Sequence, residues 1–70
     1  MNTISKKFGG EVGSLEGRKF RYTGDKWFVK NSEITLEEDD DSDMPKFSGI
    51  DTRYFTIELW AEIEYVEIIN

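Results

Sequence analysis

Every second residue is apolar from Phe55 to Tyr65, and this alternation constrains the fold of segment 53–69 more than any other feature of the chain. Because successive side chains of a β-strand point to opposite faces of a sheet, it predicts strand with one buried face. The phase slips at Tyr65 and Val66, which predicts a bulge, a bend or a short 3₁₀ turn between Trp60 and Tyr65 that divides the segment into two strands. A helix is the competing interpretation of residues 58–65, which contain good helix formers. The predicted inner face carries Phe55, Ile57, Leu59, Ala61, Ile63 and Tyr65, and the outer face carries Tyr54, Thr56, Glu58, Trp60, Glu62 and Glu64.

A second alternating pattern predicts an antiparallel meander over residues 18–36. Residues 19–22 alternate polar and apolar side chains, Gly24 and Asp25 form a candidate two-residue turn, and residues 27–29 return as a second strand. A further turn leads to a third strand, and the pairing directs Trp27 inward and Phe28 outward. The predicted pairs are Thr23–Lys26, Tyr22–Trp27, Phe20–Val29, Lys30–Glu33, Val29–Ile34, Trp27–Leu36 and Lys26–Glu37.

Glycines divide the chain into regions. Five of the six glycines fall within the first 24 residues, so we expect residues 1–16 to form an irregular or partly ordered arm. Residues 17–70 then form a single small β domain with an acidic loop at 37–46, and a turn at residues 48–49 precedes the next strand. Apolar residues of the arm are expected to dock on the core or to add a short edge strand: Ile4, Phe8, Val12 and Leu15.

Five short strands without a convincing long helix indicate an all-β fold. We expect a small five-stranded antiparallel barrel or a strongly twisted sheet, of the SH3-like or OB-like kind. The chain has no Cys and no His, so neither disulfides nor the usual zinc ligands can support the fold, and the core must do so. No apolar run has the length of a signal peptide or of a membrane span, which predicts a cytoplasmic protein.

The same composition argues against catalysis. Without His or Cys, Ser–His and Cys–His nucleophilic arrangements are impossible, and the acids lie in a loop or on an exposed strand face, so we expect no catalytic residue and no cofactor. Asp39, Asp41 and Asp43 have the first three ligand spacings of an EF-hand loop. Met44 then stands where glycine is needed and Ile50 where a bidentate Glu is needed, so we expect no metal site.

Charge is divided unevenly along the chain, with a balance of +4 over residues 1–32 and of −10 over residues 33–70. Rows of carboxylates can stand in for phosphates in the cationic groove of a DNA- or RNA-binding protein. The chain resembles small acidic inhibitor proteins of phages and mobile elements in size and charge. We therefore expect a non-enzymatic module that binds a basic partner protein through Glu37, Glu38, Asp39, Asp40, Asp41, Asp43, Glu58, Trp60, Glu62 and Glu64.

Two alternatives remain open at the level of sequence. One is an SH3-like interaction or assembly domain that binds through exposed aromatic residues, with Tyr54, Trp60 and Phe28 as candidates. The other is a single-strand nucleic-acid binder, although the net charge of −6 opposes direct contact with phosphates, and we expect no nucleic-acid or membrane partner and a monomer or weak homodimer. The candidate residues for nucleic-acid binding are Arg18, Lys19, Arg21, Lys26 and Lys30 with Phe20, Tyr22, Trp27 and Phe28.

Overall fold

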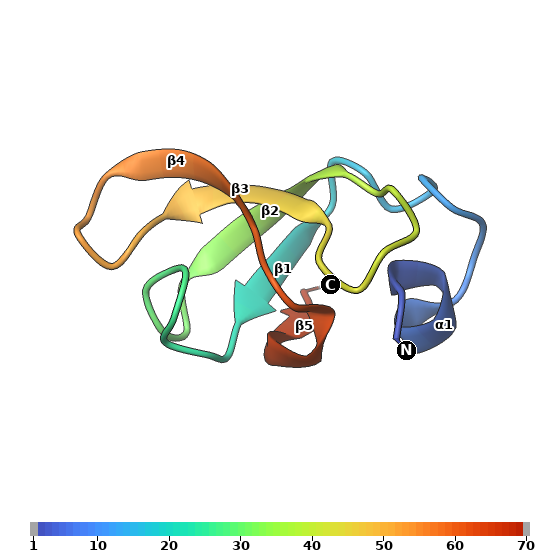
Figure 1. Ribbon diagram of the computed structural model, residues 1–70, viewed down its shortest axis with the longest axis horizontal. Helices are drawn as coiled ribbons and strands as arrows, with labels where there is room; N and C mark the ends of the chain where they lie inside the picture. Colours follow the sequence, from blue (N-terminus) through green and yellow to red (C-terminus); the bar gives the residue numbers. More distant parts are fainter. Residues whose placement is uncertain (1, 70) are drawn as a thin grey trace.

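The computed structural model describes residues 2–69 and contains one antiparallel sheet of five strands in the order β4-β3-β2-β1-β5 (Figure 1). The first four strands form a meander in this order, and the last strand returns beside the first. The elements are α1 (Ile4–Phe8), β1 (Lys19–Tyr22), β2 (Glu33–Glu38), β3 (Lys46–Ile50), β4 (Thr56–Trp60), the 3₁₀ helix η1 (Ile63–Tyr65) and β5 (Val66–Ile68).

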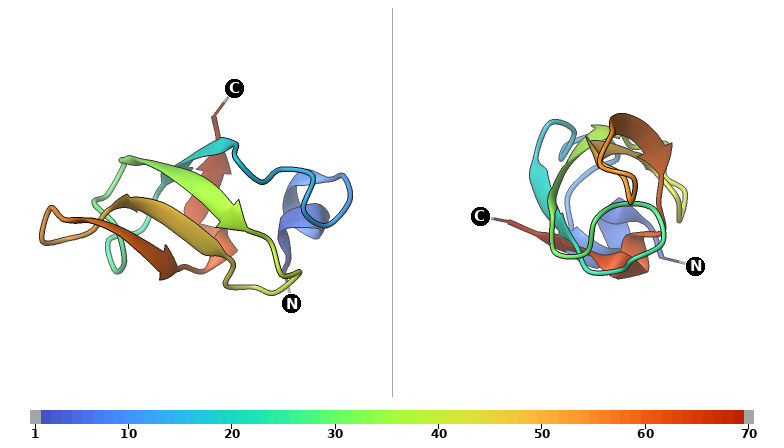
Figure 2. Two further views of the ribbon diagram at one scale, coloured as in Figure 1. Left: turned by 90° about the horizontal axis from the view of Figure 1, so that it is seen from above. Right: turned by 90° about the vertical axis from the view of Figure 1, so that its left-hand side faces the viewer.

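The prediction of five antiparallel strands in an all-β fold is confirmed, but the sheet is not a closed barrel. Viewed along the molecule, the sheet curls around its core (Figure 2). The two outer strands, β4 and β5, do not pair with each other: β4 pairs with β3, and the three-residue β5 pairs with β1. The sheet therefore keeps two edges.

The carboxy-terminal segment follows the predicted division into two strands. β4 ends at Trp60, one turn of 3₁₀ helix covers Ile63–Tyr65, and β5 begins at Val66, so the helical interpretation of residues 58–65 is wrong for β4. The predicted inner face is correct at its centre, where Ala61 and Ile63 are buried. It is wrong at its ends: Phe55 is 63% exposed in the turn before β4, and Tyr65 is 39% exposed in η1, where the period of two no longer applies.

The predicted meander over residues 18–36 is wrong. β1 pairs directly with β2, with Phe20 opposite Ile34, and residues 23–32 form a loop that joins the two strands. Two backbone hydrogen bonds to Tyr22 close the base of this loop. The C=O of Tyr22 accepts from Asn31 N (2.7 Å), and its N–H donates to Ser32 O (3.0 Å). Its one β-bridge joins Phe28 to Asp51.

Within this loop the two neighbouring aromatic residues exchange the expected roles. Phe28 is fully buried, whereas Trp27 is half-buried and only packs against the core. The loop also removes the predicted ion pairs of Lys26 with Glu37 and of Lys30 with Glu33, because these residues no longer face each other. Lys26 instead lies 3.9 Å from Glu62.

The amino-terminal arm docks on the core, as expected for its apolar residues, and apart from the short α1 it has no helix or strand over residues 9–17. Thr3 caps α1 by accepting from Lys6 N, and Ile4 is buried in the core. Phe8 and Leu15 pack against the core, Val12 is 52% exposed, and the arm adds no edge strand within the described residues. The core consists of Ile4, Phe20, Tyr22, Phe28, Ile34, Leu36, Phe47, Ala61, Ile63 and Val66.

The acidic loop is shorter than predicted, because β2 extends through Glu38 and the loop covers residues 39–45. The turn predicted at residues 48–49 is also wrong, since both residues lie inside β3. Close packing requires glycine at position 49, because a Cβ there would lie 2.7 Å from Ile34 Cγ2. Among the described residues, no helix is long and apolar enough to cross a membrane.

Candidate functional site

The fold brings acidic residues from two distant parts of the chain together on one surface. Ala61 N donates to Pro45 O (3.2 Å) and Ile63 N donates to Asp43 O (3.1 Å), so the loop 39–45 runs alongside the segment that follows β4. The pocket that these segments form has a volume of about 320 Å³. It is lined by Asn2, Asp43, Glu62, Ile63 and Glu64. We call this surface, with Asp40 and Asp41, the acidic end.

Asp39 holds the acidic loop in place and is not available to a partner. Its side chain is almost fully buried and accepts hydrogen bonds from Gly13 N (2.9 Å) and Asp41 N (3.0 Å). Its own N–H donates to Glu16 (2.8 Å), so the loop is tied to the amino-terminal arm. Asp39, expected from the sequence to bind a partner, thus has a carboxylate that the fold itself uses.

The neighbouring loop residues remain exposed while the backbone is ordered. Asp40 accepts from both the N–H (3.2 Å) and the hydroxyl (2.6 Å) of Ser42, and Asp41 has a left-handed backbone with φ of 61°. Within residues 2–69, no Lys or Arg lies within ion-pair distance of Asp40, Asp41 or Asp43. The loop thus presents unneutralised carboxylates on a fixed backbone.

Glu62 is the most constrained carboxylate of the acidic end. It accepts a hydrogen bond of 2.6 Å from Trp27 Nε1, and Lys26 Nζ lies 3.9 Å from it. Burial opposes ionisation of this group, but the Trp27 hydrogen bond and the charge of Lys26 outweigh it and lower the pKa of Glu62. Glu62 is therefore a fixed negative charge at the wall of the pocket. Its neighbour Glu64 is exposed and raises the pKa of Tyr65.

The other predicted acids lie on the outer face of the sheet, away from the core, and the continuous row expected along the last strand is absent. Glu58 is on β4, whereas Glu62 and Glu64 come after that strand has ended. Glu37 accepts a hydrogen bond from Ser48 (2.6 Å). The outer face is of mixed sign, because Lys46 lies over the ring of Trp60, 5.2 Å from its centre. Glu37, Glu38 and Glu58 are exposed, and Trp60 is 54% exposed.

The basic hairpin proposed for nucleic-acid binding does not form. Phe20, Tyr22 and Phe28 are fully buried, so they cannot stack on bases, and Phe28 cannot serve as an exposed anchor. Lys19 donates to Thr35 (2.8 Å), and Arg21 lies 3.7 Å from Glu67. The EF-hand spacing likewise forms no cluster: no group of three or more acidic residues within residues 2–69 is arranged to hold a metal ion.

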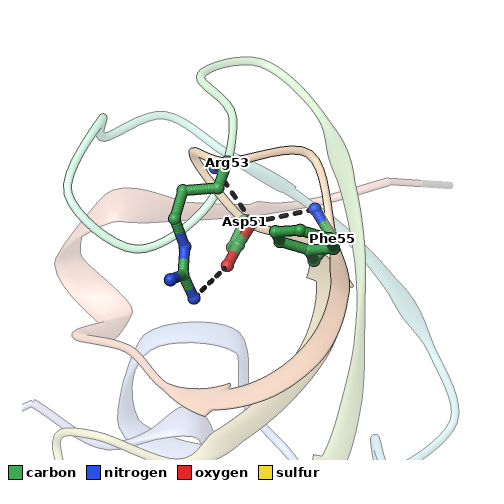
Figure 3. Close-up of polar contacts among 3 residues, drawn as sticks. All are labelled: Asp51, Arg53 and Phe55. Carbon is green, nitrogen blue, oxygen red and sulfur yellow. Dashed lines mark hydrogen bonds and ion pairs between the residues drawn. The ribbon is translucent and has the colours of Figure 1, made fainter.

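A second exposed surface, the turn between β3 and β4, has a buried carboxylate at its centre (Figure 3). Asp51 Oδ1 accepts from Arg53 N and Phe55 N, both at 2.9 Å, and Oδ2 lies 3.4 Å from Arg53 Nη2. These bonds hold Tyr54 in a left-handed conformation with φ of 68° and leave Tyr54 77% and Phe55 63% exposed. We call residues 51–55 the aromatic tip; it lies at the opposite end of the molecule from α1 (Figure 2).

Sequence reasoning named Tyr54 and missed Asp51 and Phe55. A signal was present, because Asp commonly accepts hydrogen bonds from the backbone two residues ahead in a turn. Asp51 stands in such a position relative to Arg53.

We expect the aromatic tip to lose its order in acid. The Phe55 N–H bond, with further bonds and the charge of Arg53, lowers the pKa of Asp51 below its ordinary value of 3.8. A lowered pKa in the folded state stabilises the fold at pH values above the ordinary range, and this contribution disappears as the pH falls through the lowered pKa. The protection factors of the Arg53 and Phe55 amides, measured by NMR and corrected for the intrinsic pH dependence of exchange, should therefore fall in acid before those of the core amides do.

Asp51→Asn provides the control for this prediction. It retains one acceptor oxygen but has no charge to titrate, so the protection factors of both amides should be lower at neutral pH and change little between neutral pH and acid. If wild-type and variant tips exchange alike at every pH, the carboxylate does not hold the turn.

Comparison with protein families, curated proteins and solved structures found no match for this chain. The two surfaces themselves are therefore the basis for inferring a function. The acidic end combines fixed carboxylates, unpaired charge and a pocket, whereas the aromatic tip offers exposed apolar area on a rigid turn.

Proposed function

We propose that this chain is a non-enzymatic protein-binding module whose acidic end engages a basic surface of a partner protein. The observation that carries the proposal is the convergence of Asp43, Glu62 and Glu64 on one pocket from separate segments of the chain. Complementary charge steers two proteins toward each other and fixes their orientation. A partner that normally binds nucleic acid supplies such a surface, so the module acts there as an inhibitor that occupies the place of phosphates.

Ordering of the acidic loop before binding supports this function. A flexible loop loses conformational freedom on binding, which weakens the complex. Here the bonds of Asp39 to Gly13 N and Asp41 N and of Asp40 to Ser42 already fix the backbone. The exposed carboxylates can then meet cationic groups without that loss.

The proposal predicts that Asp41→Asn with Asp43→Asn weakens partner binding about tenfold, because two exposed charge contacts are removed. Asn preserves the size of the side chain and tolerates the left-handed backbone at position 41. The partner is captured from an extract of the source cells, identified by mass spectrometry, and titrated against both variants at low and high salt. Wild-type affinity should fall steeply with salt.

Asp25→Asn with Glu33→Gln is the matched control, because it removes the same net charge from exposed positions outside the acidic end. This pair should change affinity by less than about twofold, since distant exposed charges are screened. Equal losses in both pairs would show that net charge alone matters. No loss in either pair would contradict the role of the acidic end.

The second candidate is an SH3-like interaction domain that binds through exposed aromatic residues. The order of the elements supports this candidate: β1 to β4 form a meander, and one turn of 3₁₀ helix leads to a last strand beside β1. Its surface support is the exposure of Tyr54, Phe55 and Trp60, since aromatic residues dominate many binding interfaces. Binding through the tip would persist at high salt, so the salt titration separates the two candidates.

A further inference from the structure

β4 is an edge strand whose outward backbone groups are open. Antiparallel strands bond through alternate residues. At the two ends of the β3–β4 pair, Asp51 N donates to Phe55 O (2.9 Å) and Ala61 N donates to Pro45 O (3.2 Å), which fixes the phase of this alternation. This alternation directs the N–H and C=O of Ile57 and Leu59 toward β3, and those of Thr56, Glu58 and Trp60 away from it. β4 is the outermost strand on this side of the sheet (Figure 1).

Nothing in the described chain covers these outward groups. No turn, loop or side chain of residues 2–69 forms a hydrogen bond with the backbone of Thr56, Glu58 or Trp60. An exposed edge of this kind is a template for one more strand, and many domains bind extended peptides in this way.

The opposite edge, β5, is partly covered by contrast. Thr23 N donates to Tyr65 O (2.6 Å), so alternation turns the C=O of Val66 outward. There it accepts from Lys7 Nζ (3.0 Å), which also donates to Ile63 O (2.8 Å). A lysine from α1 thus covers the Val66 end of this three-residue edge, while the five-residue β4 edge has no such cover within the described residues.

The side chains along β4 define the partner. Thr56, Glu58 and Trp60 are exposed on the outer face, and Ile57 and Leu59 are only half-buried on the inner face. An added strand with basic residues on one face and apolar residues on the other would set a cation opposite Glu58 and extend the apolar cover of Ile57 and Leu59. The acidic end continues this complementarity beyond Trp60.

We propose that the β4 edge binds an extended segment of the partner protein as a sixth strand, with basic and apolar residues alternating along that segment. The inference rests on the proposed function, because it specifies how the basic partner is held. A second copy of β4 is a poorer occupant, since an antiparallel pair centred on Glu58 would place two carboxylates directly opposite each other.

The test uses a capped peptide of alternating lysine and valine residues as the probe. On binding, the amide protons of Thr56, Glu58 and Trp60 should exchange more slowly, by about tenfold at a peptide concentration ten times Kd. The amides of Ile57 and Leu59 should change little, because they already face β3. Protection at other positions, or no binding tighter than about 1 mM, would overturn the proposal.

Two substitutions of Glu58 distinguish the contribution of its backbone N–H from that of its side-chain charge. Glu58→Pro removes an outward N–H, a change that edge strands tolerate, and should abolish peptide binding. Glu58→Gln keeps the N–H and should weaken binding only about two- to fivefold, the effect of losing one cross-strand charge pair. Equal binding by the two variants would contradict strand addition.

A modified peptide keeps the test decisive if Glu58→Pro does not fold. N-methyl groups on alternate residues of the peptide remove the donors on one edge and leave its charge unchanged, so one of the two alternate patterns should lose binding and the other should retain it. If Asp41→Asn with Asp43→Asn weakens partner binding while Glu58→Pro does not, the proposed function stands and strand addition is wrong. The reverse result would exclude the acidic end as a partner-binding surface and would support strand addition at β4.

Discussion

Replacement of Phe28 by alanine is expected to lower the free energy of unfolding by about 3–5 kcal/mol. Phe28 is fully buried, and its ring packs edge-on against Tyr22 with the two ring centres 5.5 Å apart. Small domains are stable by roughly 5–15 kcal/mol, so the loss removes a large share of the stability. Urea denaturation followed by circular dichroism measures it.

Trp27→Ala is the control, because Trp27 is adjacent in sequence and larger in size. Its half-buried side chain and its bond to Glu62 predict a smaller loss of about 1–2 kcal/mol. The sequence pattern alone predicts the opposite order of the two effects. A larger loss for Trp27→Ala than for Phe28→Ala would therefore contradict the loop described for residues 23–32.

The second large effect is expected at Gly49. A Cβ there would lie 2.7 Å from Ile34 Cγ2 and 3.3 Å from Phe28 Cδ1, so Gly49→Ala forces side chains of the core apart. Overpacking of this kind costs about 1–3 kcal/mol, even though alanine is otherwise more favourable than glycine in a strand. The same urea titration gives the value.

A double-mutant cycle identifies the clash as the cause. Ile34→Ala removes Cγ2, so Gly49→Ala should cost less in that background than in the wild type. Ser48→Ala, one residue earlier and on the outer face, should cost less than about 1 kcal/mol. Additive effects at Gly49 and Ile34 would show that the two positions do not compete for space.

The sequence predicts the parts of this fold that depend on local alternation. Residues 56–60 follow the period of two and form β4, and the slip in phase at Tyr65 marks η1 and the start of β5. These features need no knowledge of distant contacts, because burial of one face is sufficient to fix them.

The prediction fails where distant contacts compete with a plausible local pattern. The turn at Gly24 and Asp25 is reasonable in isolation, but the bonds of Tyr22 with Asn31 and Ser32 close a wider loop. Gly49 looks like a turn residue, yet it lies within β3 and allows the close approach of Ile34. Neither contact has a signature in the neighbouring residues.

At the acidic end, too, the sequence predicts what depends on composition and misses what depends on distant contacts. The charge division predicts where carboxylates gather, and Asp43 and Glu64 are found there. The structural roles of Asp39 and Glu62 could not be predicted, because their partners, Gly13 and Trp27, lie 26 and 35 residues away in the sequence. Which charges are available to a partner is therefore a property of the fold.

The bonds from Lys7 to the carbonyl groups of Ile63 and Val66 bear on how an assembly through the sheet can continue. A sheet with two open edges can grow in both directions and propagate into a fibre. Here the β5 edge is only three residues long, and Lys7 occupies its Val66 end. Strand addition at β4, as proposed above, therefore favours discrete one-to-one complexes over polymers.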